Sequence, residues 1–177
     1  MFALDVTEPN AIKFLWEKNA SDIPGMGNIL GKPIIAQVAD GDWQVFVGNG
    51  PNGAGGESRL LMLDVSTGYS TVINTGATGD NGLSGVNVWA STPGGFSDRV
   101  YAGDLKGHMW RFSRNSSGSW AAGLLFKAAH GTTHQPITAT PLVARRPGTT
   151  ETWVMFGTGR YLNSADLGDK SVQSWYG

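Results

Sequence analysis

Short runs of alternating apolar and polar residues recur along the chain, and each run is closed by a turn rich in Gly, Asn or Ser. Similar strand-like runs open at residues 33, 85 and 136, so the spacings are 52 and 51 residues. Each opening leads through a polar turn into a second apolar run, a pattern typical of β-strands. A repeat of about 50 residues with four strands has the size of a β-propeller blade.

The second half of each repeat predicts a β-hairpin, in which a strand-like run, a turn and a second run follow one another. The three hairpins are Phe2–Val6 with Lys13–Trp16, Leu61–Val65 with Ser70–Ile73, and Met109–Phe112 with Leu124–Phe126. The strand that opens the last repeat is expected at Pro136–Thr140. Helical periodicity is weak, and its best stretch, Ala11 to Lys18, is short.

These runs predict an all-β, propeller-like chain of four-stranded blades, with about three blades' worth present. We expect residues 1–20 to form the second half of a blade, 33–75 and 85–128 to form whole blades, and 136–177 to form the first part of another. Closed propellers have about four to eight blades. No signal peptide precedes the first strand-like run, and Gln173–Gly177 ends inside another. We therefore expect a piece of a longer protein.

Composition supports many short strands and excludes several classes of function. The chain has 26 Gly and seven Trp in 177 residues, which suits tight turns and aromatic packing between sheets. With 13 basic and 14 acidic residues there is no basic stripe, so we expect no nucleic-acid partner. The absence of Cys excludes disulfides and thiol catalysis. No apolar run approaches the roughly 20 residues that span a bilayer.

Asp5, Asp64 and Asp104 each follow a strand-like run, and we interpret them as equivalent residues of the repeated hairpins. An Asp at the end of a strand accepts hydrogen bonds from backbone N–H groups of the next turn. Because a catalytic residue is normally needed once, recurrence favours this structural role. The alternative is that several such carboxylates approach the central channel and hold a cation. His108, close to Asp104, is interpreted as incidental.

Other motifs with chemical potential have simpler interpretations. Gly48–Gly53 matches G-x-G-x-x-G, but a dinucleotide site needs a helix after the glycines, and Pro51 and a strand follow here. We interpret His130 and His134, like His108, as loop and strand-end residues. We expect no catalytic and no cofactor-binding residues.

Most Trp side chains are expected between blades, with Trp120, beside a Ser/Gly turn, the most accessible. The alternative is that a row of exposed aromatics binds sugar rings by stacking. A calcium loop needs carboxylates at alternating positions because the ion takes six to eight oxygens. The pairs Asp40 with Asp42 and Asp166 with Asp169 each offer only two.

Five ordered motifs closely resemble the C-terminal β-propeller domain of the PilC/PilY family of type IV pilus biogenesis factors and tip adhesins. They are MFALDVTEPNAIKFLWE, LGKPIIAQV…WQVFVGNG, RVYAGDLKGHMWRFS, HQPITATPLVA and VMFGTGRYLNSADLGDKSVQSWYG. The resemblance implies a non-enzymatic, exported protein of Gram-negative bacteria at the pilus tip, outer membrane and cell surface. Such a protein promotes pilus extension, twitching motility and attachment to surfaces or hosts. The implied partners are minor pilins or the pilus assembly machinery, and a host or surface receptor.

The family commonly carries a calcium loop, D-x-D-x-D-G-x-x-D, just before the Y-A-G-D motif. Asp98 matches its last acidic position, while the other three ligand positions hold Ala90, Thr92 and Gly94. One carboxylate and a hydroxyl cannot replace four acidic side chains, so we expect no strong calcium site and no cofactor. Asp98 is the one retained acidic position of a degenerate loop.

Two other classes of protein remain open as alternatives. Ala3–Val6 and Leu63–Gly68 also resemble the A-x-D-x-x-T-G repeats of pyrroloquinoline-quinone dehydrogenases. Those enzymes need an acidic base, a central calcium site and usually a vicinal Cys pair, which this chain lacks. The second alternative is a carbohydrate-binding or scaffold propeller unrelated to pili.

Overall fold

The computed structural model describes all 177 residues, and every strand pairing in it is antiparallel apart from one isolated bridge. Two four-stranded sheets fill the middle of the chain. The first sheet contains β3 (Ile34–Ala39), β4 (Asp42–Gly48), β5 (Arg59–Asp64) and β6 (Ser70–Asn74), in that order. The second sheet contains β7 (Leu83–Trp89), β8 (Arg99–Asp104), β9 (His108–Arg114) and β10 (Trp120–Lys127). The predicted all-β, propeller-like fold class is confirmed.

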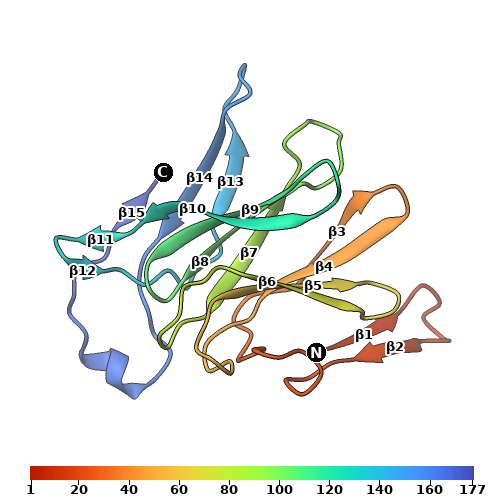
Figure 1. Cartoon of the computed structure of the whole chain (residues 1–177), viewed down its shortest axis with the longest axis horizontal. Helices are drawn as coiled ribbons and strands as arrows, with labels where there is room; N and C mark the ends of the chain where they lie inside the picture. Colours follow the sequence, from red (N-terminus) through yellow and green to blue (C-terminus); the bar gives the residue numbers. More distant parts are fainter.

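Smaller sheets precede and follow this pair. The N-terminal hairpin is β1 (Phe2–Asp5) with β2 (Lys13–Glu17), and the C-terminal sheet is β13 (Leu142–Arg145), β14 (Thr152–Gly157) and β15 (Trp175–Tyr176). A short ribbon, β11 (Ala129–His130) with β12 (Thr133–His134), and one 3-10 helix, η1 (Ser164–Gly168), complete the chain. The sheets succeed one another from the red hairpin to the blue C-terminal sheet (Figure 1). No helix is long and apolar enough to cross a membrane.

Each neighbouring pair of sheets shares an apolar core, because alternate side chains of a strand point to opposite faces. In β5, Leu61 and Leu63 belong to the core shared with the N-terminal hairpin, and Leu60 and Met62 belong to the core shared with the second sheet. Residues 60–63 therefore read as a continuous apolar run, since both faces of this strand are buried.

Glycines set the distance between the sheets. A Cβ on Gly48 would lie 2.1 Å from the carbonyl oxygen of Ser84, and one on Gly103 would lie 2.2 Å from Cγ2 of Ile137. At Gly48 the backbone of the first sheet is in direct contact with the second sheet, and at Gly103 the backbone of the second sheet is in direct contact with Ile137, which precedes the C-terminal sheet. Close approach between sheets, as well as turns, accounts for the high glycine content.

The prediction of a strand at Pro136–Thr140 is wrong. Ile137 forms only an isolated parallel bridge with Gly159, and the ladder of the C-terminal sheet begins at Leu142. The reason lies in the backbone bonds of Ile137, whose N–H donates to the carbonyl of Asp104 and whose carbonyl accepts from Ser84. The backbone N–H and carbonyl of Ile137 are therefore bonded to the second sheet and cannot pair with a strand of the C-terminal sheet.

The outer faces of the terminal sheets carry exposed apolar side chains. Trp153 and Trp175, on the same face of the C-terminal sheet, are 50% and 72% exposed, and Phe2 and Phe14 are exposed on the N-terminal hairpin. Contiguous apolar faces of this kind favour association.

We expect the purified 177-residue chain to associate as its concentration rises, because self-contact removes these faces from water. Size-exclusion chromatography with light scattering measures the mass. Replacing both Trp153 and Trp175 by Ser should reduce association, whereas Tyr69→Ser, at a lone exposed aromatic, should leave it unchanged. A dispersed monomer of the parent chain at every concentration would contradict this expectation.

Candidate functional site

Asp5 and Asp64 are turn carboxylates, as their sequence context predicts. Asp5 accepts a hydrogen bond from the backbone N–H of Thr7 at 3.0 Å. Asp64 Oδ1 accepts from the backbone N–H and the hydroxyl of Thr67, both at 2.7 Å, and from the backbone N–H of Ser66. These bonds, from Thr7 and Thr67 foremost, hold the pKa of each carboxyl below its ordinary value. Both residues stabilise turns through hydrogen bonds to Oδ1.

Asp104 is not equivalent to these two residues, so that part of the prediction is wrong. Asp64 ends β5, the third strand of its sheet, whereas Asp104 ends β8, the second strand of the next. The corresponding positions elsewhere are Asn49, directly after β4, and Thr158, directly after β14. Each of the three follows a glycine, so the repeated unit at this point is Gly followed by Asn, Asp or Thr.

The Asp104 side chain is fully buried and accepts hydrogen bonds at both oxygens. Its Oδ1 accepts from two backbone N–H groups of the following turn, those of Lys106 and His108, at 2.9 Å each. Its Oδ2 lies within hydrogen-bonding distance of four side-chain donors from three parts of the chain. They are Asn81 Nδ2 at 3.0 Å, Trp110 Nε1 at 2.8 Å, His108 Nδ1 at 2.9 Å and Ser58 Oγ at 3.4 Å. We call Asp104 and these four residues the Asp104 network.

His108 is therefore not incidental. Its Nδ1 lies 2.9 Å from Asp104 Oδ2, so the imidazole is held against the buried carboxyl group. The spacing Asp104, His108, Trp110 could have indicated this arrangement: two residues on one face of β9 point back across a tight turn. Ser58 and Asn81 give no such signal, since they lie 46 and 23 residues from Asp104 in sequence.

Asp98, the retained acidic residue of the degenerate loop, closes the segment between β7 and β8. Its two carboxylate oxygens accept from the backbone N–H and the hydroxyl of Ser91, and Arg99 donates to it at 3.0 Å. From the C-terminal sheet, Arg145 donates to the carbonyl of Ser91 at 2.9 Å. Ala90, Thr92 and Gly94 contribute no acidic side chain here.

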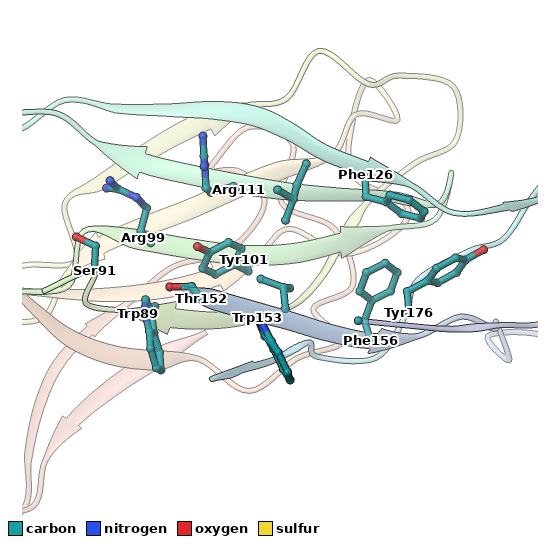
Figure 2. Close-up of a pocket in the computed structure, with 13 residues that line it drawn as sticks. Trp89, Ser91, Arg99, Tyr101, Arg111, Phe126, Thr152, Trp153, Phe156 and Tyr176 are labelled. Carbon is teal, nitrogen blue, oxygen red and sulfur yellow. The ribbon is translucent and has the colours of Figure 1, made fainter. Parts of the chain in front are cut away.

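A cleft of about 500 Å³ lies between the second sheet and the C-terminal sheet. Figure 2 shows Arg99, Tyr101 and Arg111 on one wall, with Phe126 and Tyr176 close together at one end. The rings of Phe126 and Tyr176 are 4.9 Å apart. Burial raises the pKa of the Tyr101 phenol, so it stays protonated. The cleft combines an aromatic end with a polar, cationic end.

The tryptophans occupy both buried and exposed positions, and the expectation for Trp120 is wrong. Trp120 is half-buried against the core of the first and second sheets, with its ring centroid 5.4 Å from that of Phe46. Trp175 is the most exposed tryptophan, followed by Trp153 and Trp43. The turn beside Trp120 is polar, but the strand that follows turns the ring inward.

The remaining candidates have structural roles. Gly48 ends β4, and residues 49–53 lie in the loop between β4 and β5 with no helix after it, as predicted. Asp42 accepts from Gln44, and Asp169 accepts from the backbone N–H of Ser171, which lowers the pKa of Asp169. His130 and His134 lie in the β11–β12 ribbon, as expected of strand-end residues.

Asp166 is the N3 residue of a capping box at the start of the 3-10 helix, whose N-cap is Asn163. Its carboxylate accepts from the backbone N–H groups of Leu162 and Asn163 and pairs with Arg160 at 2.8 Å. These contacts, the Leu162 bond foremost, lower its pKa. No group of three or more His, Cys, Asp or Glu side chains lies close enough to hold a metal ion.

Blade-like antiparallel sheets stacked face to face, with a polar residue closing the second strand of successive sheets, define a β-propeller module. The chain belongs to the PilY1 β-propeller domain family, whose model matches residues 1–177. The resemblance found in the motifs is thereby confirmed.

Named relatives agree with this assignment. A type IV pilus biogenesis factor PilY1 homolog of Xylella fastidiosa is 49% identical over 177 residues, which are all of this chain and 14% of the relative. PilY1 of Pseudomonas aeruginosa strain PAO1 is 36% identical, over all of this chain and 18% of that protein. The crystal structure of the P. aeruginosa PilY1 C-terminal domain matches 97% of this chain and 41% of its own, with a TM-score of 0.85 and 32% identity. The chain spans less than a fifth of these curated relatives.

Proposed function

We propose that this chain is a non-enzymatic module of an exported type IV pilus biogenesis factor that acts at the pilus tip and cell surface. The observation that carries the proposal is the match of the family model to all 177 residues. Relatives that cover the whole chain at 49% and 36% identity are named as type IV pilus biogenesis factors. In this role the module promotes pilus extension, twitching motility and attachment.

A binding role fits the buried carboxylates better than catalysis. A general base needs an oxygen within reach of the substrate proton. Asp104 is fully buried and Asp166 is nearly so, and hydrogen-bond donors already occupy both carboxylates. No observation favours a quinone-dependent dehydrogenase over the proposed pilus module, and none favours a propeller unrelated to pili.

The partners proposed are minor pilins or the pilus assembly machinery, together with a host or surface receptor. Such contacts need exposed loops and faces with apolar side chains. The outer face of the C-terminal sheet, with Trp153 and Trp175, offers one surface of this kind.

A chimera tests the proposal in a cell. In P. aeruginosa strain PAO1, the matching segment of PilY1 is replaced by this chain, which is 36% identical to it. We expect the chimera to restore surface pili, measured after shearing, and twitching zones to a strain that lacks PilY1. The same chimera with Gly48→Val, which drives a side chain into the second sheet, should restore neither, whereas Gly123→Ala should behave like the parent. A chimera that accumulates in full but restores neither pili nor twitching would overturn the proposed role.

A further inference from the structure

The segment between β7 and β8, residues 90–98, is an irregular loop whose two ends are tied together by one carboxylate. Asp98 Oδ1 accepts from the backbone N–H of Ser91 at 2.8 Å, and Asp98 Oδ2 accepts from the Ser91 hydroxyl. Arg99 donates both to this carboxylate at 3.0 Å and to the Asp98 carbonyl at 2.8 Å. The negative charge of the loop is therefore neutralised by a side chain next to it.

A second cation reaches the same loop from another sheet. Arg145, the last residue of β13, donates to the carbonyls of Ser91 at 2.9 Å and Ala90 at 3.4 Å. Its guanidinium carbon also lies 5.8 Å from the centroid of the Trp89 ring. The contact joins residues more than 50 positions apart in sequence. Figure 2 shows Trp89, Ser91 and Arg99 together at the end of the cleft opposite Phe126.

The residues of this loop do not fit the calcium ion that the family resemblance implies. Calcium takes six to eight oxygens, several of them carboxylate oxygens. The loop offers one carboxylate, on Asp98, and the donors of Ser91 and Arg99 occupy it. The carbonyls of Ala90 and Ser91 face Arg145. A divalent cation there would displace these bonds and approach two guanidinium groups of like charge.

We propose that Arg99 and Arg145 take the place of a divalent cation in this loop. Arg99 neutralises the charge of Asp98. Arg145 donates hydrogen bonds to the carbonyls of Ala90 and Ser91 and so connects the loop to the C-terminal sheet. The β7–β8 loop of this chain consequently keeps its conformation whether or not calcium is present. The inference concerns this chain's own residues and does not depend on the proposed role in pilus biogenesis.

Hydrogen–deuterium exchange of the 177-residue chain tests the clamp. In the parent chain, calcium or a chelator should leave amide exchange in residues 90–98 unchanged, and calorimetry should detect no calcium binding. Arg145→Gln should accelerate exchange in residues 90–98 by about tenfold, because a charge-assisted bond to the loop is lost. Arg146→Gln is the matched control, since the exposed Arg146 side chain pairs with Glu151 and lies over the Trp153 ring, and has no hydrogen bond to residues 90–98.

Two results would overturn the proposal. One is stoichiometric calcium binding by the parent chain with slower exchange in residues 90–98. The other is an Arg145→Gln chain that exchanges there no faster than Arg146→Gln. Unfolding midpoints of the two variants separate a local opening of the loop from a general loss of structure.

Variants with added acidic residues test whether the Arg145 guanidinium takes the place of calcium. Replacing Ala90, Thr92 and Gly94 together by Asp restores the family's acidic positions, and Asp tolerates the left-handed backbone of Gly94 (φ 72°). We expect this variant to bind calcium more tightly when Arg145 is also changed to Gln than when Arg145 is retained. Equal affinity in the two backgrounds would contradict the role assigned to Arg145.

Discussion

Asp104→Asn should lower the free energy of unfolding of the 177-residue chain by about 3–5 kcal/mol, the cost of breaking a buried charged network. An amide has one oxygen where the carboxylate has two. If that oxygen keeps the bonds from the backbone N–H groups of Lys106 and His108, the new NH₂ group faces the donors of Asn81 and Trp110. The buried N–H groups of Asn81 and Trp110 then face another donor and lose their hydrogen-bond acceptor.

Asp64→Asn provides the matched control, because Asp64 also accepts several hydrogen bonds but lies in an exposed turn. Water can replace the lost bonds there, so we expect a loss of roughly 1 kcal/mol or less. Urea titrations followed by tryptophan fluorescence measure both variants. Similar losses for Asp104→Asn and Asp64→Asn would contradict the central place of the Asp104 network in stability.

Gly48→Ala should destabilise the chain by about 3 kcal/mol or more, an unusually large loss for the addition of one methyl group. The new Cβ would lie 2.1 Å from the carbonyl oxygen of Ser84 and 2.4 Å from that of Leu83. Both obstacles are backbone atoms of β7, so no side-chain rotation relieves the clash. The first and second sheets must move apart, which opens the core between them.

Gly123→Ala, on β10, is the control for the loss of a strand glycine. Its Cβ would lie 3.6 Å from the nearest heavy atom, an ordinary contact. We expect a change within about 0.5 kcal/mol, with a gain equally acceptable because glycine weakens strands. Thermal unfolding of the two variants decides the matter: a Gly48→Ala chain as stable as Gly123→Ala would show that the sheets tolerate a wider spacing.

The repeated hairpins could be predicted because their signal is local. Alternating apolar residues, a turn of Gly, Asn or Ser and a second run occur within about 15 residues. The prediction of a strand at Pro136–Thr140 was wrong because the residues that decide its structure are distant in sequence. Its residues have the composition of a strand, but Asp104 and Ser84, from the second sheet, bind the backbone of Ile137 first.

The candidate sites were harder to predict because their partners are distant in sequence. Ser58 reaches Asp104 across 46 residues, and Arg145 reaches Ser91 across 54. Asp104 was placed in the wrong position of the repeat because several strands of a blade end in a similar polar residue and turn. Only the order of strands in the sheets shows that Asn49, not Asp64, is its counterpart.

The cores between neighbouring sheets differ in size, which affects the order in which the sheets unfold. Eleven buried residues join the first and second sheets, whereas four, Met109, Ala128, Ile137 and Phe156, join the second sheet to the C-terminal sheet. Less apolar surface removed from water means a smaller free energy of separation. We therefore expect the C-terminal sheet to open by local unfolding at a lower free energy than the pair formed by the first two sheets, which faster amide exchange in β13–β15 than in β4 and β5 would show. On this expectation, a partner that bound the C-terminal sheet would stabilise the part of the chain with the smallest shared core.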